Sequence, residues 1–316
     1  MTLESKAQDI PILLICFNRP DKLRKVVSQL GLVQPKRIFV HFDGPRNADD
    51  EACIEAGFAI VKEIDWTKDK IVLVQTENLG CGRAVYSAVS WFFEHVEFGL
   101  ILEDDVIVHP KFFEILNIYF SLNISFTLAG ISGFNRVPTR FLREPSATFY
   151  RSIYAQSIAW GTRREAWKGF SLEPRIWQTG FESEILKRLG NRDFQRFWRI
   201  LLTRQLQTRK LDTWDVQWQA YNWKMNRRFA ITTENFASHI GFGQSATHAV
   251  SPDIPKWHPT MRTNIEVPQQ FVMPSLEVDT SADNWSNTHF YPITKFSRLH
   301  LYLSLCKKKF LKVFTS

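Results

Sequence analysis

Three consecutive acids, Glu103, Asp104 and Asp105, follow the apolar run "GLIL" at residues 99–102. Adjacent carboxylates repel one another, so three of them at the end of a buried strand indicate a nearby cation. Carboxylate oxygens are the hard ligands that Mg²⁺ or Mn²⁺ prefers, and such an ion usually keeps several waters and binds substrate phosphates. The stretch therefore predicts a metal–diphosphate site. The alternative is a solvated turn whose acids cap the next helix.

Two further kinds of residue could take part in this chemistry. Asp215, in "TWDVQW", has aromatic neighbours and could act as a general base in a partly desolvated pocket. It could equally be a helix N-terminal acid that the helix dipole favours. His109, His239 and His248 could each complete a metal shell, although a role other than metal binding is the commoner one for an isolated histidine.

Phosphate-binding loops of the common kinds are absent from the sequence. It contains no G-x-x-x-x-G-K-[ST] motif and no G-x-G-x-x-G motif after a strand. The stretch "NLGCGRA" (78–84) has two glycines before a predicted helix, but their spacing matches neither motif. This weakens ATPase and dinucleotide-dehydrogenase interpretations and is compatible with a nucleotide held chiefly through a metal.

The first ~105 residues alternate between strand and helix patterns. Apolar runs predict strands, and apolar residues at helical spacing predict the helices between them. The strands are expected at 11–16, 36–44, 70–75 and 99–105, and the helices at 21–30, 47–64 and 81–97. This order predicts an α/β fold with a mainly parallel sheet flanked by helices. Ligands bind such sheets beyond the carboxyl ends of the strands, where Arg19, Asp43 and the three acids would meet.

The pattern is less regular after residue 110. A helix is expected directly after Pro110, a strand near 149–157, and helices over 181–210 and 213–226. Residues 234–248 are expected to form a glycine-rich loop. Residues 251–292 hold six prolines and little periodicity, which predicts an irregular extension. A final basic helix would follow.

Composition limits the class of protein. The chain has 316 residues, 44% of them hydrophobic, which is enough for a sizeable core. Its four cysteines include no C-x-x-C pair, which predicts a reduced, cytoplasmic protein without a zinc site or a disulfide framework. No signal peptide and no transmembrane helix are expected.

The positive charge is concentrated near the C-terminus. Six of the eight net positive charges lie in residues 295–316, which contain no acid. The rest of the chain is nearly balanced, which argues against a nucleic-acid partner. Residues 295–316 also carry an apolar stripe at helical spacing. They could bind an anionic membrane surface, placing the protein peripherally at the inner face of the membrane, or dock on the body with their lysines in water.

Several motifs together resemble one family. They occur in family order and are "ILLICFNRP", "HFDGPRNADDE", "NLGCGRAV", "WFFEHVEFGLILEDD", "ISGFN", "AWGTRREAWKG", "WDVQW" and "IGFGQSATH". The chain resembles bacterial nucleotide-diphospho-sugar transferases of the GT-A (Rossmann-like) fold, distant relatives of N-acetylglucosaminyltransferase I. The resemblance covers about residues 10–250. It implies a GT-A domain over 1–250, with a nucleotide-binding half at about 10–130, an acceptor half at about 131–250, and a C-terminal extension over 251–316.

The resemblance also implies roles for individual residues. Asp105 would bind Mn²⁺ (or Mg²⁺), and Asp215 would be the catalytic base. Glu103 and Asp104 would contact ribose or support the metal shell. The remaining nucleotide-sugar contacts would come from Arg19, Asp43 and Arg83 at the base, Trp160 and Gly161 beside the donor sugar, and Ser238 and His239 over the diphosphate.

Two departures from the family pattern stand out. The family has a second acid after the catalytic base, where this chain has Val216. The family commonly reads "WGWATW" where this chain has "IAWGTRREAW", so the donor-sugar pocket is expected to differ.

The function that the resemblance implies is metal-dependent, inverting transfer of a sugar from a nucleotide-diphosphate donor, such as UDP-GlcNAc, to a saccharide or lipid-linked acceptor in surface glycan assembly. The alternatives are a sugar nucleotidyltransferase, which would need glycines and a basic signature after the first strand, and a catalytically dead, membrane-associated scaffold.

Overall fold

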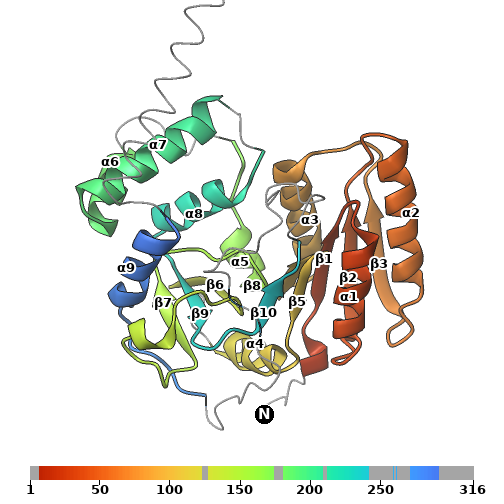
Figure 1. Ribbon diagram of the computed structural model, residues 1–316, viewed down its shortest axis with the longest axis horizontal. Helices are drawn as coiled ribbons and strands as arrows, with labels where there is room; N and C mark the ends of the chain where they lie inside the picture. Colours follow the sequence, from red (N-terminus) through yellow and green to blue (C-terminus); the bar gives the residue numbers. More distant parts are fainter. Residues whose placement is uncertain are drawn as a thin grey trace, which may run out of the picture.

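The computed structural model describes residues 7–122, 127–173, 181–208, 212–241, 259, 261 and 271–291, with the side chains of 181–183 and 203–208 excepted. Figure 1 shows a broad central sheet with helices on both of its faces. Within the described residues this confirms the predicted α/β class with a mainly parallel sheet.

The first part of the chain alternates strand and helix as the sequence predicted. The elements are β1 (Ile12–Cys16), α1 (Pro20–Leu30), β2 (Arg37–Phe42), α2 (Ala48–Lys62), β3 (Asp69–Val74), α3 (Cys81–His95) and β4 (Phe98–Glu103). The four strands are parallel and lie in the order β3-β2-β1-β4, with Leu14 aligned to Val40 on one side and Leu102 on the other. Helices start where local chemistry allows, since Pro20 opens α1 and Asn47 caps α2 by accepting from the Asp50 amide at 2.9 Å.

The second part of the chain extends the same sheet. Its elements are α4 (Lys111–Ser121), β6 (Leu128–Ser132), β7 (Phe149–Ser152), β8 (Trp160–Arg163), α5 (Arg164–Trp167), α6 (Phe181–Leu189), α7 (Arg192–Thr208), α8 (Asp215–Lys224) and β9 (Arg228–Thr232). The sheet continues from β4 in the order β8-β6-β9-β7. Strand β8 runs antiparallel between β4 and β6, and β7 is antiparallel to β9. Strands β6, β8 and β9 were not predicted from the sequence.

A second, two-stranded sheet lies beside the acids. It pairs β5 (Val106–Val108) with β10 (Ala237–His239), antiparallel, with Ser238 opposite Ile107. The segment around β10 was predicted to be a glycine-rich loop. In the structure, residues 237–239 pair with β5 as a strand, and His239 lies against Asp105, directly after β4.

Two hydrophobic layers cover the two faces of the sheet. On one face, Leu14, Val40 and Leu102 pack with residues of α1, α2 and α4. On the other face, Leu13 and Phe39 pack with residues of α3, α5 and α8, where the tryptophans gather. Because alternate residues of a strand point to opposite faces, both layers come from the same short apolar runs.

One helix lies in the segment that was predicted to be irregular. Helix α9 (Thr280–His289) packs beside β7 and the 3₁₀ turn η2 (Thr139–Phe141); a second such turn, η1 (Ala7–Asp9), precedes β1. Asp279 caps α9, and Asp283 is buried beneath it against β7. Within the parts of the chain that the structure describes, no helix is both long and apolar enough to cross a membrane.

Candidate functional site

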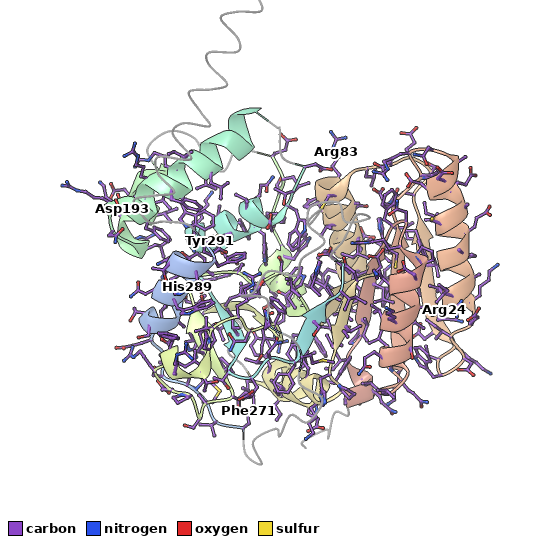
Figure 2. The ribbon with its side chains drawn as sticks, viewed as in Figure 1. Arg24, Arg83, Asp193, Phe271, His289 and Tyr291 are labelled. Atoms are coloured by element: carbon purple, nitrogen blue, oxygen red, sulfur yellow. The ribbon has the colours of Figure 1, made fainter. Side chains whose placement is uncertain are left out.

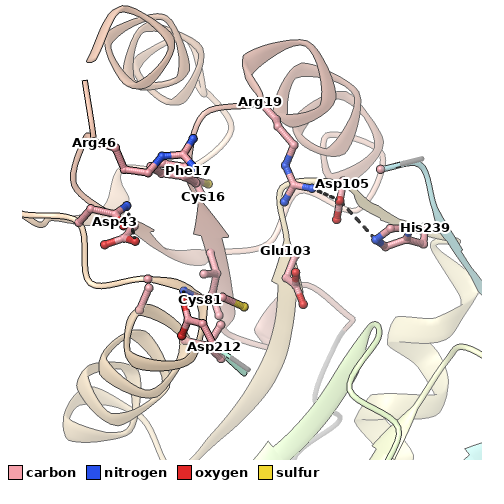
Figure 3. Close-up of a pocket in the computed structure, with 16 residues that line it drawn as sticks. Cys16, Phe17, Arg19, Asp43, Arg46, Cys81, Glu103, Asp105, Asp212 and His239 are labelled. Atoms are coloured by element: carbon pink, nitrogen blue, oxygen red, sulfur yellow. Dashed lines mark hydrogen bonds and ion pairs between the residues drawn. The ribbon is translucent and has the colours of Figure 1, made fainter. Parts of the chain in front are cut away.

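A cavity of about 390 Å³ opens at the carboxyl ends of β1, β2 and β4 (Figure 3). Backbone hydrogen bonds hold these strand ends side by side: the Asp43 amide donates to Cys16 O and the Asp104 amide donates to Ile15 O, both at 3.0 Å. The residues that line the cavity are Ile15, Cys16, Phe17, Arg19, Asp43, Arg46, Asn78, Gly80, Cys81, Ala84, Val85, Glu103, Asp105, Asp212, His239 and Gly241. The polar residues at these strand ends therefore lie together in the structure, as the sequence predicted.

The three acids have different surroundings. Glu103 ends β4 and lines the cavity. Asp104 is turned inward, where its carboxylate accepts from the Phe17 amide at 3.0 Å and pairs with Arg19 at 2.6 Å. Asp105 Oδ2 pairs with Arg19 and with His239 Nε2, the latter at 3.3 Å. Asp105 Oδ1 is buried and has no hydrogen-bond partner among the described residues, an arrangement that calls for an explanation in a native protein.

Burial and neighbouring charges shift the pKa values of the three acids in different directions. Burial, with the nearby charge of Asp105, raises the pKa of Glu103 to about 7. Burial also raises the pKa of Asp104 to about 6, against the opposing charge of Arg19. For Asp105 the effect of burial is outweighed by His239 and Arg19, which lower its pKa. Carboxylates whose pKa values rise in this way are stabilised by an added cation.

Asp43 is fixed by the loop that follows β3. Its Oδ1 accepts from the Gly44 amide at 2.9 Å and the Leu79 amide at 2.8 Å, and its Oδ2 accepts from Asn78 Nδ2 at 3.0 Å. Burial raises its pKa, and these amide donors oppose the rise. The stretch "NLG" thus orients Asp43 at the cavity wall, a role for Asn78 that the sequence analysis missed.

Arg46 and Phe17 form another part of the wall. The Arg46 guanidinium lies 4.8 Å from the centre of the Phe17 ring, and its Nε pairs with Asp50 at 2.7 Å. Neither was predicted as a site residue. Arg46 follows Asp43 by three residues in "HFDGPR", so its place on the loop beyond β2 was the available signal.

Asp215 lies at the start of α8, outside the residues that line the cavity. It is exposed, and its Oδ1 accepts from the Val216 amide at 2.8 Å and from the Thr213 hydroxyl. Its charge nevertheless reaches the cavity. Burial, and then the charges of Glu103, Asp212 and Asp215, raise the pKa of the Cys81 thiol to about 12.

Other predicted residues lie elsewhere. Arg83 is exposed on α3, pointing away from the body in Figure 2, and is not part of the cavity wall. Trp160 and Gly161 are buried in β8, where the Trp160 ring stacks on Trp214 at 5.3 Å. The Ser238 hydroxyl accepts from the Met261 amide at 2.8 Å.

The two other candidate histidines do not join the site in the described part of the chain. His109 Nδ1 accepts from the Lys111 amide at 3.2 Å, and its ring lies beside Phe236, away from the cavity wall. His248 lies outside the described residues.

The fit of a divalent cation can be judged from the donor set. Among the described residues, no three His, Cys, Asp or Glu side chains are grouped as a complete metal shell. Glu103 and the unpartnered Asp105 Oδ1 would provide one or two carboxylate ligands. That number suits Mg²⁺ or Mn²⁺ bound together with water and substrate phosphates, so the residues fit such an ion.

Comparison with known proteins adds structural similarities of limited extent. No protein-family model and no curated protein matches the sequence. Mouse xyloside xylosyltransferase 1 aligns over 68% of this chain and 81% of its own, with 11% identity and a TM-score of 0.33. HddC from Yersinia pseudotuberculosis aligns over 49% and 77%, with 12% identity and a TM-score of 0.30.

A putative glucose-1-phosphate thymidylyltransferase from Bacillus anthracis aligns over 76% of this chain and 91% of its own, with 8% identity and a TM-score of 0.31. At these identities and TM-scores the similarities assign neither a family nor a function to this chain.

Proposed function

We propose that the chain is a metal-dependent, inverting glycosyltransferase of the GT-A type. It would move a sugar from a nucleotide-diphosphate donor, a UDP-sugar such as UDP-GlcNAc, to a hydroxyl group of a saccharide or lipid-linked saccharide in surface glycan assembly. The observation that carries the proposal is the single cavity that Asp43, at the end of β2, lines together with Glu103 and Asp105, at the end of β4.

The cavity has two chemically different ends that suit a nucleoside diphosphate. In Figure 3, Asp43, Arg46 and Phe17 lie at one end, Asp105 and the side chains paired with it lie at the other, and Glu103 lies between. Asp43 is held by donors from Gly44 and residues 78–80 and lines the cavity, so its carboxylate is an acceptor at the place where a ring N–H could bind. The base would therefore bind beside Asp43 and the diphosphate beside Asp105.

Asp105 and Glu103 would hold the cation in this arrangement. When bound, Mn²⁺ or Mg²⁺ would neutralise negative charge on the diphosphate as the leaving group departs. Arg19 and His239 both bind Oδ2 of Asp105, which fixes the carboxylate and leaves Oδ1 as its unused acceptor. Asp104 supports this geometry indirectly, because it orients the guanidinium of Arg19.

Asp215 would act on the acceptor. As the acceptor oxygen attacks the anomeric carbon, its proton would pass to the Asp215 carboxylate. The bond from the anomeric carbon to the diphosphate oxygen breaks, and its electron pair leaves with the nucleoside diphosphate. Attack from the face opposite the leaving group inverts the anomeric centre. The exposed position of Asp215 at the start of α8 supports this role, since an acceptor can approach it.

A panel of nucleotide sugars tests the proposal. Each donor is incubated with the full chain in Mn²⁺, Mg²⁺ or EDTA, and release of nucleoside diphosphate is measured. We expect release from at least one UDP-sugar with metal, and a loss of release in EDTA. Release of pyrophosphate from a nucleoside triphosphate and a sugar phosphate would instead identify a nucleotidyltransferase. If no nucleotide bound or reacted, the chain would be a non-catalytic scaffold and the proposal would be wrong.

A further inference from the structure

The first turn of α3 is bound by a carboxylate from a distant part of the chain. Asp212 accepts from the Cys81 amide at 2.6 Å and from the Gly82 amide at 2.8 Å, across more than 120 residues of sequence. Helix N-termini present unpaired amides and a positive dipole end, so an acid there makes charge-assisted hydrogen bonds. Figure 3 shows Asp212 next to Cys81 at the cavity wall.

Two glycines make room for this contact. Gly80 has φ +78°, and a Cβ added to it would overlap the Asp212 carboxylate. A Cβ added to Gly82, which is helical, would lie 2.9 Å from Thr213 O and 3.1 Å from Asp212 Oδ1. The glycines of "NLGCG", which match no phosphate-binding motif, are therefore explained by the close approach of residues 212–213.

The same contact leads directly to Asp215. The Thr213 hydroxyl donates to Asp215 Oδ1, and the Thr213 carbonyl accepts from Gln217 Nε2 at 3.0 Å. A chain of neighbouring contacts thus joins the α3 amides, Asp212, Thr213 and Asp215. It links a helix of the nucleotide-binding half to the start of a helix in the second half.

We propose that Asp212 is a positioning residue, whose bond to the first turn of α3 holds the start of α8, and with it Asp215, beside the donor cavity. This inference rests on the proposed function, because it assigns Asp215 the role of base. A displacement of about 1 Å at a reacting group can cost on the order of 100-fold in rate. The contact would therefore affect the transfer step more than donor binding.

Two variants break the contact from opposite sides. Asp212→Ala removes the carboxylate. Gly82→Ala keeps it but places a methyl group against Thr213 O and Asp212 Oδ1, while alanine favours the helix more than glycine does. For both we expect kcat for transfer to fall by roughly 10- to 100-fold. The Kd for UDP with Mn²⁺ should stay within about 3-fold of the wild-type value. For Asp212→Ala it could also decrease, because the variant loses a negative charge that repels the anionic ligand.

Asn191→Ala is the matched control. Asn191 also accepts from two helix N-terminal amides, those of Asp193 and Phe194, both at 3.0 Å, but at the start of α7 and outside the cavity wall. The Asn191→Ala variant should lower Tm, as Asp212→Ala does, but leave kcat unchanged. If Asp212 were only a helix cap, Gly82→Ala would keep wild-type kcat. That result would overturn the proposal.

Amide hydrogen exchange supplies a readout that does not depend on activity. Both variants should speed exchange in the peptide covering residues 212–218 under conditions where Tm shows the protein folded. Unchanged exchange there would also overturn the inference. If the wild-type protein transferred no sugar from any donor, the proposed function would fail, and the exchange data would still show whether Asp212 holds the start of α8.

Discussion

Each of the three acids at the end of β4, Glu103 to Asp105, contacts a different set of groups. Asp104 is buried against the Phe17 amide and Arg19, Asp105 pairs with Arg19 and His239, and Glu103 lines the cavity. The family resemblance implied that Arg19 contacts the nucleotide base. In the structure its guanidinium pairs with both aspartates, and the side chain is 18% exposed. These contacts indicate that Arg19 holds the two aspartates in place.

Asp215→Asn tests the base at the scale of one residue. The amide keeps an oxygen that can accept from Thr213 and Val216, so the start of α8 should keep its geometry. Because the amide cannot take a proton, we expect transfer to fall by roughly 10²- to 10⁴-fold. UDP affinity with Mn²⁺ should remain at the wild-type value. The measurements are steady-state transfer kinetics and titration calorimetry on the same preparations.

Asp193→Asn is a suitable control, because Asp193 is also an acid in the first turn of a helix and lies outside the cavity wall, at the left edge of the molecule in Figure 2. It should leave transfer unchanged. Transfer by Asp215→Asn at near the wild-type rate would show that the base lies elsewhere.

The sequence predicted those helices and strands that local patterns determine. Apolar runs and helical stripes were sufficient for β1 to β4 and for the helices between them. Strand β8 could not be predicted in this way, because "WGTR" is short and becomes a strand only between β4 and β6. Strand β10 likewise depends on pairing with β5. The role of Asp212 was missed for the same reason, since its partners lie on α3.

Helix α9 introduces a buried titratable group outside the site. The Ser152 hydroxyl and the Ile153 amide donate to the Asp283 carboxylate, the latter at 3.1 Å. Burial still dominates and raises the pKa of Asp283 from 3.8 to about 7. The folded state therefore binds a proton between about pH 4 and pH 7 that the unfolded state has lost. Stability should consequently decrease as pH rises through this interval.

Asp283→Asn should remove this pH dependence. The asparagine can donate to Ser152 and accept from Ile153, so the site remains filled. The wild-type protein should lose up to about 1.4 kcal/mol of unfolding free energy per pH unit relative to the variant between pH 5 and 7, with no further change above that range. Urea unfolding at pH 5, 6, 7 and 8 measures the difference. Equal slopes for both proteins would mean that Asp283 does not carry this proton.

At the scale of the whole molecule, the two parts of the sheet meet between β4 and β8, and the cavity lies at the carboxyl ends of β1, β2 and β4, where residues from the second part also reach it. Asp212 and His239 both come from beyond residue 200, whereas Asp43 directly follows β2 and Glu103 ends β4. The sequence predicted that acids would gather at strand ends, because strand ends can be read locally. Of the two distant side chains, His239 was expected there from the family resemblance, and nothing in the local pattern indicated Asp212.

The basic segment at residues 295–316 lies outside the described residues, and its membrane role remains a prediction from sequence. Removing it should abolish co-sedimentation with vesicles that contain anionic lipid. Donor binding should be retained, because the cavity wall is formed before residue 242. Vesicles of zwitterionic lipid provide the control, and neither protein should bind them. Equal binding of both proteins to anionic vesicles would contradict the prediction.

Calorimetric titration of UDP tests most directly whether the acids at the end of β4 hold a metal–diphosphate. The titration is run with and without Mn²⁺ on the wild-type chain, on Asp105→Asn and on the surface control Asp69→Asn. Asp69 is 41% exposed and pairs with Arg37 on β2, away from the cavity wall. We predict that Mn²⁺ tightens UDP binding at least 10-fold for the wild type and for Asp69→Asn, and by less than 2-fold for Asp105→Asn. Mn²⁺-dependent tightening of the same size in Asp105→Asn would contradict the central claim that the acids at the end of β4 hold a metal–diphosphate.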